Sequence, residues 1–162
     1  MFKRQPDFII GEADNPYMLR WWVIPRNRFF NIYLHKILRS DDDRALHDHP
    51  WWNVSFLLKG GYLEVMPYFS GIRGHISADL PYGQRRKIRR RFSFVFRRAE
   101  AAHRLELIEA APCWSLFITG PKIREWGFYC PKRWRHWKDF VAITPGGNEI
   151  GKGCAESRPG EP

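Results

Sequence analysis

The chain has 162 residues, of which 44% are apolar and 16% aromatic, so it can form the core of one domain and is not a disordered chain. Its formal net charge of +10 permits nucleic acid, an anionic surface or an acidic protein as partner, without choosing among them. No apolar run reaches membrane-spanning length, and the N-terminus lacks the apolar core of a signal peptide. We therefore expect a cytoplasmic protein with no membrane partner.

Most of the chain consists of short runs rich in aromatic and β-branched residues, separated by turn residues, as is typical of strands. The expected strands cover residues 19–24, 28–38, 54–59, 62–66, 92–96, 101–107, 113–119 and 126–129. Residues 1–20 indicate an irregular arm or a short edge strand, and only residues 133–140 suggest one or two helical turns. Many short strands without a long helix predict an all-β barrel or sandwich.

Turn residues divide this pattern and mark its end. Gly60 and Gly61, between two apolar runs, predict a hairpin, while residues 40–43 form a solvated acidic turn. After Pro145 the chain becomes rich in glycine, proline and charge. We therefore expect a single domain over residues 1–144 and a flexible tail over residues 145–162.

The three cysteines, Cys113, Cys130 and Cys154, lie far apart and form no Cys-x-x-Cys pair. An odd number at this spacing argues against a disulfide framework and against a cysteine-rich structural zinc site. Cys113 lies in an apolar run, and we expect it to be buried in a strand.

Two histidines one residue apart, His47 and His49, form the most informative motif of the sequence. Side chains at i and i+2 of a strand leave the same face, so the two imidazoles make half a site for a divalent metal. His103, in another short alternating stretch, is the best candidate for the third ligand. Ordinary structural roles are favoured for the other histidines, His35, His75 and His136.

These residues resemble the cupin superfamily of small jelly-roll barrels. Its first motif has His-x-His, a glutamate after three or four residues, and a glycine six residues later; here Asn53 and Gly60 occupy these last two positions. In its second motif His103 matches the third histidine, whereas Arg98, Glu100 and Leu107 replace the usual proline, glycine and asparagine. The resemblance covers roughly residues 46–118 and implies a cupin-type jelly-roll β-barrel.

The order of the short motifs is also similar to that of uncharacterised cupin-like proteins of bacteria and phages. His-Asp-His-Pro-Trp is followed later by Thr-Gly-Pro and Trp-Gly-Phe. This likeness assigns no reaction.

The resemblance implies a divalent transition metal (Fe, Zn, Mn or Ni) bound by His47, His49 and His103. Asn53 replaces the usual glutamate ligand, which leaves three neutral imidazoles, a set that suits Zn(II) or Fe(II). Thiol-oxidising cupin dioxygenases are similar in using a three-histidine iron, so oxidation stays open beside Lewis-acid chemistry. Asn53 and Glu64 are candidates for a further ligand or for orienting a bound water.

Other side chains are candidates for the surroundings of this site. Three aromatic residues either line the mouth of the barrel or belong to its core: Trp52, Tyr62 and Phe117. Four arginines of the basic stretch are candidates for binding an anionic small molecule: Arg85, Arg86, Arg89 and Arg98. The same stretch, with residues 132–138, also permits a surface that binds single-stranded nucleic acid, or arginines that are merely solvated.

The sequence therefore predicts a metal-binding cupin. If it is an enzyme, it acts on a small, anionic molecule by oxygenase, isomerase or hydrolase chemistry. One alternative is a non-catalytic cupin that serves as a binding or assembly module, and another is a basic protein associated with nucleic acid. Pairing of two barrels into a homodimer is compatible with each of these functions.

Overall fold

The computed structural model describes residues 4–11, 14–41, 45–67, 84–130, 133–142, 149–150 and 153–154. Its strands are β1 (Phe8–Gly11), β2 (Pro16–Trp22), β3 (Asn31–Ile37), β4 (Leu46–His47), β5 (Asn53–Lys59), β6 (Tyr62–Pro67), β7 (Gln84–Arg89), β8 (Phe94–Arg97), β9 (Arg104–Leu107), β10 (Cys113–Thr119), β11 (Gly127–Tyr129), β12 (Trp134–His136), β13 (Val141–Ala142) and β14 (Glu149–Ile150). Within the described ranges, the helical elements are the 3-10 turn η1 (Ile108–Ala110) and α1 (Trp137–Phe140). No described helix is long and apolar enough to cross a bilayer.

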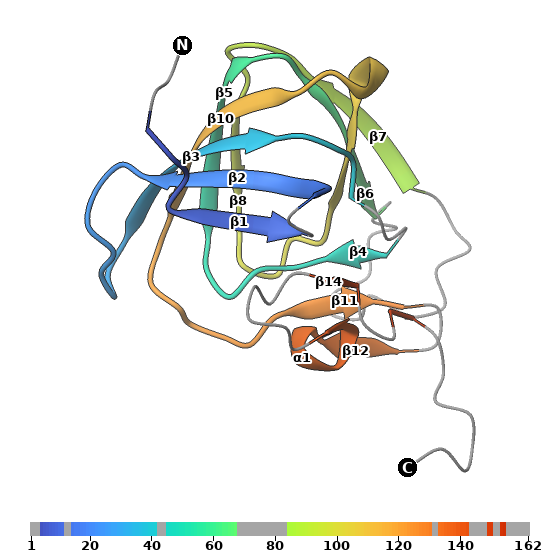
Figure 1. Ribbon diagram of the computed structural model, residues 1–162. Helices are drawn as coiled ribbons and strands as arrows, with labels where there is room; N and C mark the ends of the chain where they lie inside the picture. The colour runs from blue at the N-terminus through green and yellow to red at the C-terminus, as the bar shows by residue number, and fades with distance from the viewer. Residues whose placement is uncertain are drawn as a thin grey trace.

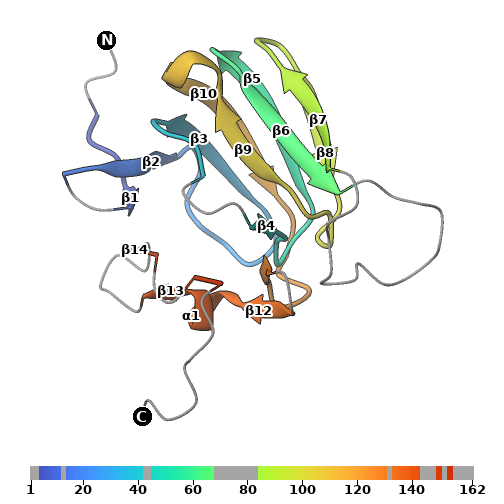
Figure 2. The same cartoon turned by 90° about the vertical axis from the view of Figure 1, so that its right-hand side faces the viewer.

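Two sheets face each other and enclose the core, as Figures 1 and 2 show. The larger sheet has the strand order β1-β2-β3-β10-β5-β8, and the smaller has the order β7-β6-β9. All their pairings are antiparallel. The predicted all-β fold is confirmed.

The turn at Gly60 and Gly61 connects these two sheets. β5 pairs with β10 and β8, whereas β6 pairs with β7 and β9, so the predicted hairpin between them is wrong. Gly60 has a φ of +74°, and a Cβ on it would lie 2.7 Å from the backbone oxygen of Pro112. The glycine therefore lets the chain pass close to Pro112 as it crosses from one sheet to the other. A Gly-Gly pair between two apolar runs looks the same in sequence whether it forms such a crossing or a hairpin.

Alternation along the strands places apolar side chains between the sheets. In β5, Leu57 is buried and its neighbours Phe56 and Leu58 are more exposed. Six buried residues form the main core: Met18, Ile37, Leu57, Tyr62, Leu105 and Cys113. Burying such side chains contributes roughly 1.5–3 kcal/mol each before chain entropy is subtracted. The predicted burial of Cys113 in a strand is confirmed.

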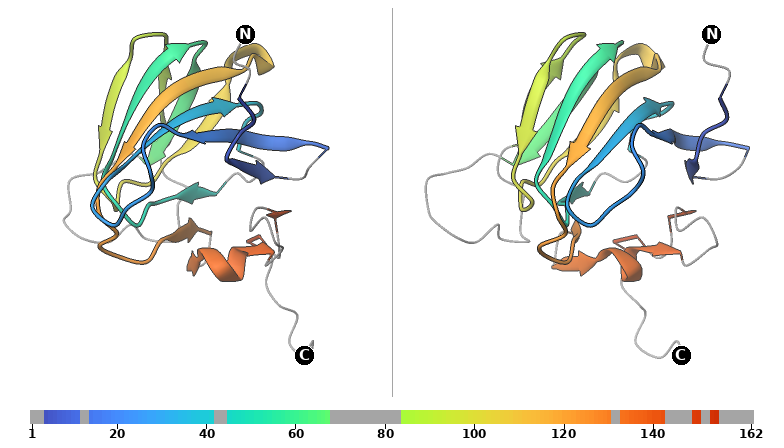
Figure 3. Two further views of the ribbon diagram at one scale, coloured as in Figure 1. Left: turned by 60° about the vertical axis from the view of Figure 1, so that its left-hand side comes forward. Right: turned by 90° about the vertical axis from the view of Figure 1, so that its left-hand side faces the viewer.

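A third layer lies across one end of the barrel, where Figures 2 and 3 show β4, β12 and α1. It is the sheet β12-β11-β4, so β4 links the first half of the chain to the C-terminal part. The ring of Phe128 in β11 stacks on that of Phe140 in α1, with the centroids 3.6 Å apart. Residues 133–140, expected to be helical, form β12 followed by a four-residue helix.

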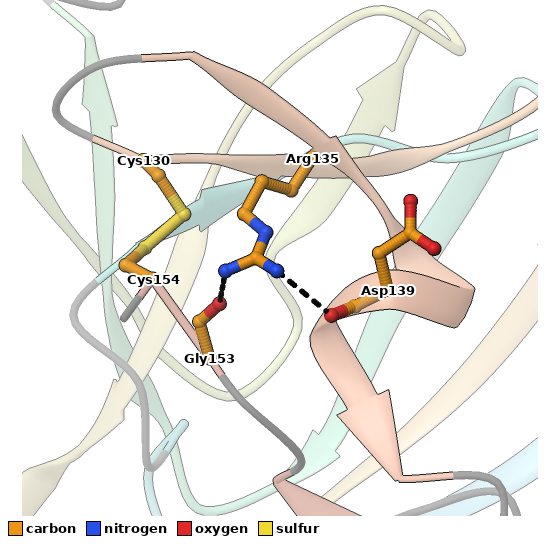
Figure 4. Close-up of a disulfide and its surroundings, with 5 residues drawn as sticks. All are labelled: Cys130, Arg135, Asp139, Gly153 and Cys154. Carbon is orange, nitrogen blue, oxygen red and sulfur yellow. Dashed lines mark hydrogen bonds between the residues drawn. A yellow bond between two sulfur atoms is a disulfide. The ribbon is translucent and has the colours of Figure 1, made fainter. Parts of the chain in front are cut away.

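A disulfide between Cys130 and Cys154 fastens residues near the C-terminus to this layer (Figure 4). Beside it, Arg135 donates to the backbone oxygen of Gly153 at 2.6 Å and to that of Asp139 at 3.2 Å. The odd number and wide spacing of the cysteines argued against disulfides, and for Cys130 and Cys154 this was wrong: Cys113 is buried separately in β10, and the chain turns back to bring the other two together. The division into residues 1–144 and a tail of residues 145–162 stays a prediction.

Candidate metal centre

A β-bridge places His47 opposite His103 at the end of the barrel that the third layer covers. The backbone N–H of each donates to the backbone oxygen of the other at 2.9 Å. Two residues further on, the backbone N–H of His49 donates to the oxygen of Ala99, also at 2.9 Å. These bonds align the His-x-His segment with residues 99–103, and so bring together histidines that are far apart in sequence.

The three imidazoles converge as a metal site requires. One ring nitrogen from each lies within 4.8 Å of the others, and the Nε2 atoms of His49 and His103 are 2.9 Å apart. Two nitrogens about 2.1 Å from one ion lie about 3.0 Å apart at a right angle. No aspartate, glutamate or cysteine of the described residues joins this group. The donor set therefore fits a transition metal with further positions open to water or a ligand.

The surroundings keep the imidazoles of His49 and His103 neutral. Burial and, next, the positive charge of Arg97 lower the pKa of His103 to about 3, although Glu64 opposes the shift. Burial also lowers the pKa of His49 well below its ordinary value, and the neighbouring histidines and arginines act in the same direction. Because metals bind the unprotonated nitrogen, both ligands are ready for metal at neutral pH.

Glu64 lies next to the Nδ1 atom of His103 and is not a member of the group of three histidines. Its Oε1 is 3.2 Å from His103 Nδ1, although the N–H is not aligned well enough for a hydrogen bond. Arg97 and Arg89 donate to its two oxygens at 2.6 and 2.7 Å. Burial opposes its ionisation, but the contacts with His103 and Arg97 lower the pKa of Glu64. The carboxylate is thus placed to orient His103, leaving Nε2 for a metal.

Arg97, only 5% exposed, occupies the barrel interior next to this site. Besides Glu64, it donates to Asn53 Oδ1 at 3.3 Å, Ser55 Oγ at 3.1 Å and Tyr62 OH at 3.2 Å. The buried Asn53 Nδ2 has no hydrogen-bond partner among the described residues. In the sequence Arg97 stands next to Arg98 and looks like a further surface arginine, although its parity with the buried Val95 indicates an inward side chain.

Asp48 points away from the histidines that flank it and anchors the third layer. Its carboxylate accepts from the Gly127 N–H at 2.7 Å, Arg124 Nη1 at 2.7 Å, Tyr129 OH at 3.2 Å and Trp134 Nε1 at 3.2 Å. This role of Asp48 was not predicted from the sequence. Alternation was the available signal, since the residue between two inward histidines must face outward.

The predicted aromatic residues lie in three different places. Tyr62 is part of the main core. Trp52 packs against Phe96, with ring centroids 6.2 Å apart, and a Cβ on Gly120 would lie 2.1 Å from its indole nitrogen. The Phe117 ring lies 6.4 Å from that of His49, so among these three Phe117 has the described contact with the histidine group.

The predicted anion-binding arginines are likewise divided. Arg85, Arg86 and Arg98 are exposed, the first two on β7. Arg89 turns inward to Glu64. Anion binding by these four side chains, and nucleic-acid binding by the basic stretch, stay predictions.

Comparisons with known proteins identify the fold. No family model and no curated protein matches the chain. A conserved protein with a double-stranded β-helix domain from Klebsiella pneumoniae aligns over 74% of this chain and 90% of its own, with 10% identity and a TM-score of 0.50. Fe(II) HppE in complex with substrate aligns over 74% of this chain and 58% of its own, with 10% identity and a TM-score of 0.52.

A cupin superfamily protein from Desulfitobacterium hafniense aligns over 68% of this chain and 84% of its own, with 11% identity and a TM-score of 0.48. The double-stranded β-helix protein from Klebsiella pneumoniae and HppE, with TM-scores of 0.50 and 0.52, show that the chain has the double-stranded β-helix fold. Identities this low establish the fold and leave the activity to be argued from the site.

Proposed function

We propose that this chain is a metal-dependent cupin in which His47, His49 and His103 hold one divalent transition metal that meets a small, anionic molecule. The observation that carries the proposal is the convergence of three imidazole nitrogens within 4.8 Å, with no carboxylate of the described residues among them. A histidine-only set suits zinc or iron(II), the two metals that we favour.

The charge of the site favours an anionic ligand. Three neutral imidazoles leave the charge of a divalent cation uncompensated, whereas a glutamate ligand would cancel part of it. Glu64 is already paired with Arg97 and Arg89 and does not supply that charge. An anion therefore gains more at this site than a neutral molecule of the same shape.

The bound metal would supply Lewis acidity or, if it is iron, a route to oxygen activation. The chain's own residues would hold and orient the reactants. We expect Glu64, whose Oε1 lies 3.2 Å from His103 Nδ1, to orient that ring, and Asp48 to hold the segment between the other two ligands. Asn53 Nδ2, a buried donor with no described partner, is placed to donate to a ligand or water in the interior.

Metal analysis of protein purified without added metal or an affinity tag tests the proposal. We expect near-stoichiometric zinc or iron in the parent, and its loss in His47→Ala and in His103→Ala. His136→Ala is the matched control, since His136 contacts Glu125 rather than the group of three histidines. A parent that contains no metal and takes none up on titration would overturn the proposal.

A further inference from the structure

Arg20 of β2 projects into the barrel interior, on the inner face of the larger sheet. It pairs in register with His35 of β3, which pairs in turn with Ser115 of β10. Directly paired residues of antiparallel strands share a face, and both His35 and Ser115 are buried. The sequence alone assigns no role to Arg20, and it favours an ordinary structural role for His35.

The Arg20 guanidinium is held in place by neutral groups. Its Nε donates to His35 Nε2 at 2.9 Å, and its central carbon lies 4.8 Å from the centre of the Tyr33 ring. Among the described residues, no carboxylate lies within ion-pair distance of it. Burial lowers the pKa of Arg20 to about 10, so the side chain still carries its charge at neutral pH.

Arg97, another arginine inside the barrel, provides a comparison, because its charge is paired with groups of the chain itself. Its guanidinium has the Glu64 carboxylate at 2.6 Å and three further oxygen acceptors. Arg20 has one described acceptor, a neutral imidazole, for a group with five N–H donors. The Arg20 side chain is only partly buried, and its other nitrogens are not among the buried atoms that lack a partner, so these donors are open to an anion from outside the chain.

Two aromatic rings connect Arg20 to the histidine group. The His35 ring stacks on Phe117 with centroids 4.9 Å apart, and Phe117 lies 6.4 Å from the His49 ring. The charge of Arg20 is also one of the causes that lower the pKa of His49. The guanidinium and the metal ligands therefore lie on the same side of the interior.

We propose that Arg20, oriented by His35 and Tyr33, binds the oxyanion group, a carboxylate or a phosphate, of the small molecule that meets the metal. This inference rests on the proposed function and assigns the recognition of the anion to a residue inside the barrel. The planar guanidinium fork matches both oxyanions, and its contact with the Tyr33 ring fixes the plane in which it can donate. Arg20 is thus the residue that would select acids over neutral molecules.

Calorimetric titration of the metal-loaded, full-length protein with inorganic phosphate and with acetate tests this proposal. We expect the parent to bind at least one of the two probes, and the tighter one indicates the class of oxyanion. Arg20→Met should weaken that binding about tenfold or more, because it removes a charged hydrogen-bond donor. Arg20→Lys, which keeps the charge and loses the fork, should give an intermediate affinity.

Arg28→Met is the matched control, because Arg28 is exposed and lies over the Phe29 ring. It removes the same charge and should leave the affinity unchanged. Equal affinities in the parent and in Arg20→Met, or no binding of either probe by the parent, would overturn the proposal. If Arg20→Met does not fold, Arg20→Lys and Arg20→Gln provide the comparison.

Metal content, measured on the same samples, separates this proposal from the proposed function. A full complement of metal in every variant, with anion binding independent of Arg20, would overturn the role of Arg20 alone. A parent that contains no metal and takes none up would overturn the proposed function. Titration of that metal-free protein would then show whether Arg20 still binds the probes.

Discussion

The two ends of the barrel interior are built by the same strands and differ in chemistry. Towards one end β3, β5 and β10 contribute Ile37, Leu57 and Cys113 to the apolar core. Further along their inner faces, the same strands present His35, Ser55 and Thr119, all of them buried. The polar end also holds Arg97, Glu64 and the three histidines near β4.

This difference separates two tasks within one fold. The apolar end stabilises the barrel through burial and close packing. The polar end costs stability, because each charged group there has lost its hydration and depends on its partners. Such a cost is typical of functional sites, where a local rule of stable folding is broken for the sake of chemistry.

Removing one member of the buried ion pair should produce the largest effect at the polar end. Arg97→Ala leaves the Glu64 carboxylate buried beside fewer donors, and we expect a loss of about 3–5 kcal/mol in the free energy of unfolding, measured by urea denaturation. Adding Glu64→Gln should recover part of it. The exposed Arg98→Ala is the control, and an effect as large as that of Arg97→Ala would contradict this interpretation.

Truncation at the apolar end should lower stability without affecting the metal. Leu57→Ala should cost about 2–5 kcal/mol through lost burial and a cavity, again by urea denaturation. Its metal stoichiometry, measured on the folded protein, should equal that of the parent. A stable variant that had lost the metal would show that the two ends are not separate.

A third test concerns the support that the polar end receives from outside the barrel. Asp48→Asn replaces a carboxylate that accepts from four donors, and we expect a loss of about 1–3 kcal/mol, together with weaker metal binding. Metal titration of the folded variant measures the second effect. Unchanged metal affinity would mean that the third layer does not position the ligands.

The pH dependence of stability should show a smaller contribution from His35. Burial and the charge of Arg20 lower its pKa well below 6.5 in the folded protein, so below about pH 6.5 the unfolded chain binds a proton that the folded chain does not. Stability should therefore fall with falling pH, by up to about 1.4 kcal/mol per pH unit for one histidine. His35→Gln keeps an acceptor for Arg20 and should reduce this slope. An unchanged slope would show that His35 is protonated in the folded state.

The sequence predicted the histidine group because it depends on local regularities. The spacing of His47 and His49 requires only that side chains alternate along a strand, and His103 was the best later candidate because it lies in another short alternating stretch. Strand 113–119 was also predicted with its observed bounds, since its turn residues are unambiguous.

The missed features depend on which strands pair and in what register. The contact of Arg20 with His35 depends on the pairing of β2 with β3. The hydrogen bonds of Asp48 depend on a layer formed about 80 residues later in the chain. Cys130 and Cys154 meet because the chain turns back. Arg97 differs from these residues because alternation within β8 alone indicates that its side chain points inward. The basic residues around it in the sequence made it look like one more surface arginine.

The contact between Asp48 and Trp134 has a practical consequence for detecting the metal. The Trp134 indole N–H donates at 3.2 Å to a carboxylate that lies, in sequence, between two of the histidines. A shift of that segment when a metal binds would change the surroundings of the indole, and with them its emission. Comparing the fluorescence of the parent with that of Trp134→Phe during a metal titration would isolate this signal from the chain's seven other tryptophans. The protein thus carries an intrinsic optical probe of its own site.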